Sequence, residues 1–178
     1  MEIKTPTTSA QRELLRAVED ITAIYPEGES FFDALDEFII KMASPEIYSA
    51  LFDMTGNKPR ILTGGFGKRI AHGIESGELP SRPFLLFKGG LRKGNQPEII
   101  KFSIDEFPKD NTFAFIDDTI YAGGTFNKIQ DFLKENDIII DQCTVVYDGC
   151  PIGRKHVQSI FRYYDYFTNV KPNFEFHA

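Results

Sequence analysis

The chain has 178 residues, which is enough for one well-packed domain and too few for two ordinary ones. Its formal net charge of −6 argues against a protein that coats nucleic acid, because that role needs surplus Lys and Arg. The N-terminal residues lack a secretory leader pattern and the apolar runs are too short to span a membrane, so we expect a cytoplasmic protein without a membrane partner.

Apolar residues at helical spacing dominate the first third of the chain. Their spacing predicts helices over residues 9–24, 30–42 and 45–54. Pro45 stands in the first turn of the third helix and Gly56 follows its end, and both positions are typical of helix boundaries. We expect residues 1–57 to form a helical cap on the remainder of the molecule.

From residue 58 onward, short apolar runs alternate with Gly-rich turns and helical stretches. The pattern predicts strands at 60–63, 82–88, 98–103, 112–116 and 138–147, and helices at 68–76 and 125–135. This order is typical of βαβ units, so the predicted fold class is α/β with a mostly parallel central sheet flanked by helices. We expect a single domain with a core at 58–150 and a C-terminal extension at 151–178, whose aromatic stretch 161–167 is expected to be packed in the core.

An acidic pair and a glycine-rich turn follow the apolar strand at 112–116. In open α/β sheets the carboxyl ends of the strands face the ligand crevice, which is where Asp117 and Asp118 are expected. Adjacent carboxylates repel each other unless a cation or hydroxyl donors lie nearby, and Mg²⁺ with the vicinal hydroxyls of a ribose provides both. Gly123 and Gly124 allow close approach of a phosphate to the start of the next helix, where Thr125 adds a hydroxyl.

The segment 113–125 resembles the phosphoribosyl pyrophosphate (PRPP) signature of type I phosphoribosyltransferases, especially orotate phosphoribosyltransferase and its relatives. The resemblance implies that Asp117 and Asp118 hold the ribose hydroxyls and, mainly through these or through water, a Mg²⁺ ion. The 5′-phosphate would lie against the loop formed by Tyr121, Ala122, Gly123, Gly124 and Thr125. The resemblance further implies PRPP and a small nitrogenous base as substrates, and a homodimer.

These enzymes also have a pyrophosphate loop after an earlier strand, and the sequence offers two candidates. One is the Gly64–Gly65 turn, and the other is the Gly89–Gly90 turn, whose Lys-Gly-Gly order resembles purine-salvage members of the family. A helical stretch soon after Gly65 favours the first. The residues expected to contact the pyrophosphate are therefore Thr63, Gly64 and Gly65, with a strained or cis peptide beside Gly64.

A basic stretch follows the second Gly-Gly turn. By the resemblance, Lys88, Arg92 and Lys93 fall where orotate-type enzymes carry the cations that stabilise the leaving pyrophosphate. Such cations lower the barrier of a displacement that releases a polyanion.

The sequence supports three hypotheses of function. The first is a Mg²⁺-dependent phosphoribosyltransferase that transfers the phosphoribosyl group of PRPP to a nitrogenous base. The second is a non-catalytic regulatory protein that binds PRPP or a nucleotide. It is favoured by Tyr121 at a position where several family members have Asp, by a basic loop without His, and by Gly149 where orotate enzymes have Arg. The third is an unrelated doubly wound domain in which Asp117 and Asp118 form a bare Mg²⁺ site.

Overall fold

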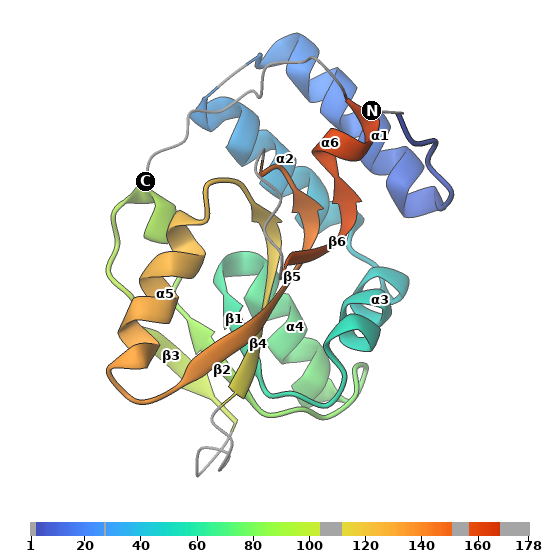
Figure 1. Ribbon diagram of the computed structural model, residues 1–178. Helices are drawn as coiled ribbons and strands as arrows, with labels where there is room; N and C mark the ends of the chain where they lie inside the picture. The colour runs from blue at the N-terminus through green and yellow to red at the C-terminus, as the bar shows by residue number, and fades with distance from the viewer. Residues whose placement is uncertain (1–2, 27, 104–111, 151–156, 168–178) are drawn as a thin grey trace.

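The computed structural model of the chain describes residues 3–26, 28–103, 112–150 and 157–167, and a six-stranded sheet lies at its centre (Figure 1). The strand order is β3-β2-β1-β4-β5-β6, and every neighbouring pair is parallel except β2 and β3. The predicted α/β class with a mostly parallel sheet is therefore confirmed. The strands are β1 Arg60–Thr63, β2 Phe84–Phe87, β3 Ile99–Phe102, β4 Thr112–Ile120, β5 Ile139–Asp148 and β6 Val157–Arg162.

Helices cover both faces of the sheet and form the predicted N-terminal cap. The cap helices are α1 Ser9–Ile24, α2 Glu29–Met42 and α3 Pro45–Thr55. The remaining helices are α4 Gly64–Ser76, α5 Gly124–Lys134 and the short α6 Tyr163–Tyr166, with a 3₁₀ turn, η1, at Leu91–Lys93. Figure 1 shows the sheet between α5 on one side and α3 and α4 on the other.

Alternate residues of each central strand point to opposite faces, so the sheet separates two apolar cores. On one face Leu62 and Ile116 pack against the cap helices and α4. On the other, Ile61 and Phe115 pack with Ile129 of α5. The strands at the centre are thus buried on both faces, as is usual for a parallel sheet covered by crossover helices.

Two elements extend well beyond their predicted limits. β4 continues past Ile116 to Ile120 because later residues, Asp117 included, still pair with β5. α4 begins at Gly64 rather than at Lys68, so the first Gly-Gly turn is the opening turn of a helix.

The strand β6, which the sequence did not predict, lies in the stretch expected as a C-terminal extension and pairs with β5. The expected packing of the aromatic stretch 161–167 is confirmed, since Phe161 and Tyr163 are buried.

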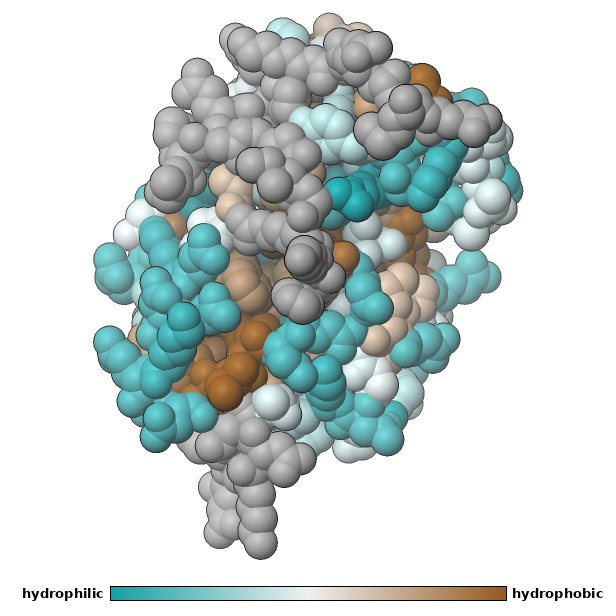
Figure 2. Space-filling view, in the orientation of Figure 1, coloured by the Kyte–Doolittle hydropathy of each residue, from teal (hydrophilic) through white to brown (hydrophobic). Residues whose placement is uncertain are grey.

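Hydrophilic residues prevail on the face shown in Figure 2, and apolar surface gathers in a few areas, the largest low on the left of that view. The large apolar side chains exposed in the described residues are Ile3, Ile24, Tyr25, Ile100, Phe102 and Ile139. Within the described part of the chain, no helix is long and apolar enough to span a membrane.

Candidate active site

The site lies where the chain leaves the sheet in two opposite directions. β1 leads through α4 to β2 on one side, whereas the neighbouring β4 leads through α5 to β5 on the other. The pairing of β1 with β4 ends at Leu62 and Ile116, while β4 runs on beside β5. Such a switch point opens a crevice at the carboxyl ends of the strands, and a cavity of about 570 Å³ lies there.

The cavity brings together nearly all of the residues that the sequence singled out. Its lining includes the predicted residues Thr63, Gly64, Gly65, Arg92, Lys93, Asp117, Asp118, Tyr121, Ala122, Gly123, Gly124 and Thr125. The exception is Lys88, which is exposed at the end of β2 and does not line the cavity. Lys128 of α5 lines it instead, and its Nζ donates a 2.8 Å hydrogen bond to the carbonyl of Leu91.

The acidic pair is held in a fixed arrangement by the backbone that follows it. The amide of Asp118 donates to Oδ1 of Asp117, and the amide of Thr119 donates to Oδ1 of Asp118, each at 2.9 Å. Burial raises the pKa of Asp117 to about 7. Burial, together with the charge and the hydrogen bond of Asp117, raises the pKa of Asp118 well above its usual range. A bound cation or a hydroxyl-rich ligand would relieve this unfavourable burial of charge.

A third carboxyl group, from the cap, completes the acidic wall of the cavity. Asp36 of α2 accepts a 2.9 Å hydrogen bond from the hydroxyl of Thr119. Its pKa is raised to about 8, first by burial and then by the charge of Asp118, while Arg92 opposes the shift. The sequence contains one indication of this acidic wall. Glu29, Asp33 and Asp36 recur at i, i+4 and i+7, which places them on one face of the helix.

The predicted phosphate loop forms the opening of α5. Gly123 is the N-cap residue and has a φ of 87°, a left-handed conformation that side chains with a Cβ rarely adopt. The amide of Asn127 makes the first bond of the helix, to the carbonyl of Gly123. The amides of the three residues before Asn127 have no partner within the helix, and no side chain caps this end. Amides of this kind bind an anion, assisted by the positive end of the helix.

The two competing Gly-Gly turns lie against each other. A Cβ added to Gly89 would stand 3.1 Å from the Cα of Gly64, so only glycine fits this approach without displacing the backbone. Both turns line the cavity. The two candidates for a pyrophosphate loop are therefore adjacent parts of one wall. Gly64 has a left-handed φ of 66°, and none of the described peptide bonds is cis.

The cations of the basic stretch lie against the cap helix. Nη2 of Arg92 is 2.9 Å from Oδ1 of Asp33, and Nη1 is 3.3 Å from Oδ2 of Asp36. The guanidinium carbon lies 5.0 Å from the ring centre of Phe32. Lys93 also pairs with Asp33, at 3.5 Å. α2 and η1 are thus joined over the cavity by ion pairs.

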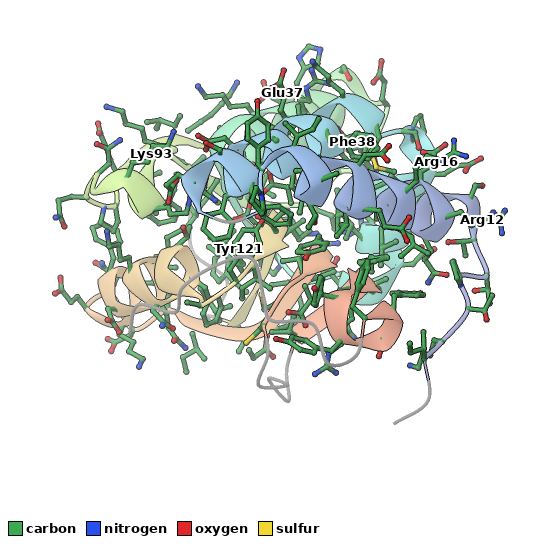
Figure 3. All side chains as sticks on the ribbon, turned by 90° about the horizontal axis from the view of Figure 1, so that it is seen from above. Arg12, Arg16, Glu37, Phe38, Lys93 and Tyr121 are labelled. Atoms are coloured by element: carbon green, nitrogen blue, oxygen red, sulfur yellow. The ribbon has the colours of Figure 1, made fainter. Side chains whose placement is uncertain are left out.

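Aromatic rings close the cavity beneath α2. The rings of Phe32 and Tyr121 are 4.3 Å apart, and both line the cavity. In Figure 3, Tyr121 and Glu37 are seen on opposite sides of α2. Tyr147, which lies on the neighbouring strand β5, stacks on Phe161 and is part of the core.

Asp148 and Gly149, which by the resemblance stand where orotate enzymes carry an Asp-Arg pair, are not among the described residues that line the cavity. Asp148 is buried, and its Oδ1 accepts a hydrogen bond from the amide of Cys150.

The carboxylate oxygens of the acidic pair are suitable ligands for Mg²⁺. Mg²⁺ is usually held by one or two carboxylates together with water and phosphate oxygens of the substrate. Asp117 and Asp118, both with raised pKa values, supply that number of protein ligands. In the described residues no group of three or more His, Cys, Asp or Glu side chains is placed to hold a metal by itself. Mg²⁺ at this site would therefore depend on oxygen atoms of the ligand.

Comparisons with known proteins give only structural likenesses. No family model and no curated protein matches the chain. Among solved structures it is similar to the adenine phosphoribosyltransferase of Thermoanaerobacter pseudethanolicus, with 12% identity and a TM-score of 0.42 over 74% of this chain and 81% of that one. It is also similar to the orotate phosphoribosyltransferase of Aeropyrum pernix, with 13% identity and a TM-score of 0.41 over 77% and 74% of the two chains.

The purine phosphoribosyltransferase of Pyrococcus horikoshii has 16% identity and a TM-score of 0.43, over 71% of this chain and 81% of its own. These three solved structures are all phosphoribosyltransferases. At these values the likeness concerns the fold alone.

Proposed function

We propose that the chain is a Mg²⁺-dependent phosphoribosyltransferase that transfers the 5-phosphoribosyl group of PRPP to a nitrogenous base and releases pyrophosphate. One observation carries the proposal. An acidic pair, with Asp118 buried and Asp117 half-buried, and the free amides at the start of α5 line one cavity at the switch point of a mostly parallel sheet. A sugar phosphate needs both features, because its hydroxyls donate to carboxylates and its phosphate accepts from amides.

Different residues of the cavity bind the 5′-phosphate and the ribose of PRPP. The amides of Gly124 and Thr125 receive the 5′-phosphate at the positive end of α5. Asp117 and Asp118 accept hydrogen bonds from the ribose hydroxyls and so orient C1′ within the cavity. The hydroxyl of Thr119 is engaged with Asp36, which ties the ribose side of the site to the cap.

The opposite wall suits the pyrophosphate. The Gly64 and Gly89 turns present backbone in close approach, and Arg92, Lys93 and Lys128 are the cations of the cavity lining. Positive charge fixed where negative charge develops on the leaving group favours the transition state over the ground state. Mg²⁺, held by Asp117 and Asp118 through ligand oxygens, would neutralise part of the pyrophosphate charge.

A turnover assay tests the proposal directly. The chain is mixed with PRPP, Mg²⁺ and a panel of purine and pyrimidine bases, and released pyrophosphate is measured. We expect release with at least one base, and its loss in the Asp118→Asn variant. Asp131→Asn is the matched control, since Asp131 is exposed on α5 and does not line the cavity. Absence of PRPP binding in calorimetry, with Mg²⁺ present, would contradict the proposal.

A second function, a regulatory protein that binds PRPP or a nucleotide without turnover, is favoured by two observations. Arg92 is engaged by three carboxylates of α2, and Tyr121 stands where several family members have a carboxylate. PRPP binding without pyrophosphate release across the whole panel would support this function. Release with any base would exclude it.

A further inference from the structure

Helix α2 presents carboxylates to the cations that the proposed pyrophosphate needs. Glu29, Asp33 and Asp36 of α2 and Arg92 and Lys93 of η1 form a group of ion pairs that we call the clasp. Nε of Arg92 is 3.5 Å from Oε2 of Glu29, in addition to its contacts with Asp33 and Asp36. All three nitrogens of one guanidinium therefore face a different carboxylate.

The charges of the clasp oppose a second anion. Three carboxyl groups surround two cations, so the clasp has no net positive charge, whether or not Asp36 holds its proton. A pyrophosphate placed against Arg92 with α2 in its present position would lie beside the charges of Glu29 and Asp33. Like charges at such distances repel, so the cations serve either the cap helix or the pyrophosphate.

The ion pairs of the clasp are weak enough for a ligand to break. The side chains of Glu29 and Asp33 are 59% and 51% exposed, and that of Lys93 is 62% exposed. Ion pairs with this exposure contribute little to stability, because water competes for both partners. η1 is also attached to the other side of the cavity, through the hydrogen bond of Lys128 to the carbonyl of Leu91. Release from α2 therefore leaves Arg92 and Lys93 at the cavity.

We propose that the clasp is an autoinhibitory contact, in which carboxylates of the cap helix occupy the cations of the pyrophosphate subsite and PRPP has to displace them. This inference rests on the proposed function, since it presumes a pyrophosphate-bearing ligand in the cavity. It assigns α2 the role of an internal competitor that lowers the affinity for PRPP. The clasp meets the ribose side of the site only at Asp36, through its hydrogen bond with Thr119, and the test below leaves Asp36 unchanged.

The test compares two ligands on the full chain by calorimetry with Mg²⁺. The variant is Glu29→Gln/Asp33→Asn, which keeps the size of both side chains and removes their charge. The matched control is Glu37→Gln, an exposed carboxylate of the same helix that pairs with Lys41 and does not line the cavity. Ribose 5-phosphate, which lacks the pyrophosphate, reports any general change in the attraction of anions. Thermal melting of each variant establishes that it is folded.

We expect the double variant to bind PRPP about three- to tenfold more tightly, in line with the loss of weak exposed ion pairs, and ribose 5-phosphate with less than about a twofold change. Glu37→Gln should match the wild type for both ligands. The clasp is also supported if the double variant binds PRPP and the wild type and Glu37→Gln do not.

Three results overturn it. Unchanged or weaker PRPP binding in the double variant, with normal binding by the wild type, refutes the clasp and leaves the proposed function standing. An equal gain for both ligands also refutes it. Failure of every form to bind PRPP removes the clasp and the proposed function together.

Discussion

The raised pKa of Asp36 gives a pH dependence of stability with a definite sign. Burial and the neighbouring Asp118 raise this pKa from 3.8 to about 8. Between these two values the folded state binds a proton that the unfolded state has lost. The free energy of unfolding therefore falls as the pH rises, until the folded carboxyl has ionised above pH 8 or so. We expect Asp36→Asn to reduce this fall, because an amide needs no proton to remain neutral.

The magnitude follows from the size of the shift. From about pH 5 to pH 8 the unfolded group is ionised while the folded one stays protonated, and three pH units at 1.36 kcal/mol each amount to about 4 kcal/mol. The side chain is 26% exposed, so water screens part of this repulsion. We therefore expect roughly 1–3 kcal/mol of the decline to disappear in Asp36→Asn.

The assay is urea unfolding followed by far-UV circular dichroism at several pH values from about 5 to 9. Wild type should lose stability steadily with rising pH, and Asp36→Asn should lose less, so that the variant gains most at high pH. Some decline remains in the variant because Asp117 and Asp118 also have raised pKa values. Glu37→Gln should follow the wild type. Parallel curves for wild type and Asp36→Asn would refute the reasoning.

Three further changes test, by urea unfolding, the packing at the site and, with Arg60, at the opposite end of β1. Gly123→Ala should lower the free energy of unfolding by about 1–2 kcal/mol, because Gly123 is left-handed, whereas Gly124→Ala, which meets no atom within 4 Å, should be neutral or stabilising. Arg60→Met should lower it by about 1–3 kcal/mol, since the buried guanidinium donates to the carbonyls of Gly56 and Lys58. Phe32→Ala should lower it by about 3–5 kcal/mol, as this buried ring packs on Tyr121.

The features that could be predicted from sequence are those encoded within a short stretch of chain. The acidic pair, Gly123 and the helix that follows are consecutive, so their order alone indicates a strand, a turn and an anion site. Local sequence gave the wrong limit at Ile116, because the acidic residues that follow suggested that the strand ends there. Pairing with β5 extends β4 through them, and that pairing comes from a partner strand that begins 23 residues later at Ile139.

The part of the site that comes from α2 could not be predicted in this way. The hydrogen bond between Thr119 and Asp36 joins residues 83 positions apart, and the contact of Arg92 with Asp33 spans 59. An acidic stripe on a helix normally faces solvent, so spacing alone gives no reason to place it over a cavity. Lys88 shows the converse limit. It is close in sequence to Arg92, yet it lies outside the cavity lining because the chain turns at Gly89 and Gly90 in between.

The charge of the cavity shows what any ligand has to bring. Among the residues that the structure describes, its lining carries five carboxyl groups, Glu29, Asp33, Asp36, Asp117 and Asp118, and three cations, Arg92, Lys93 and Lys128. An anion as highly charged as PRPP enters such a cavity only with a divalent cation, with protons on the buried carboxyl groups, or after the cap has withdrawn its acids. The raised pKa values of Asp36 and Asp117 show that protons already take part of this role near neutral pH.

This requirement holds equally for an enzyme and for a regulatory binding protein, so a dependence of PRPP binding on Mg²⁺ does not separate the two. The separation depends on what Arg92 does once the ligand is bound. An enzyme has to release Arg92 from α2 so that its charge stabilises the departing pyrophosphate. A regulatory protein can instead use the displacement of α2 as its signal, because release of the clasp changes the surface of the cap without any bond of PRPP being broken.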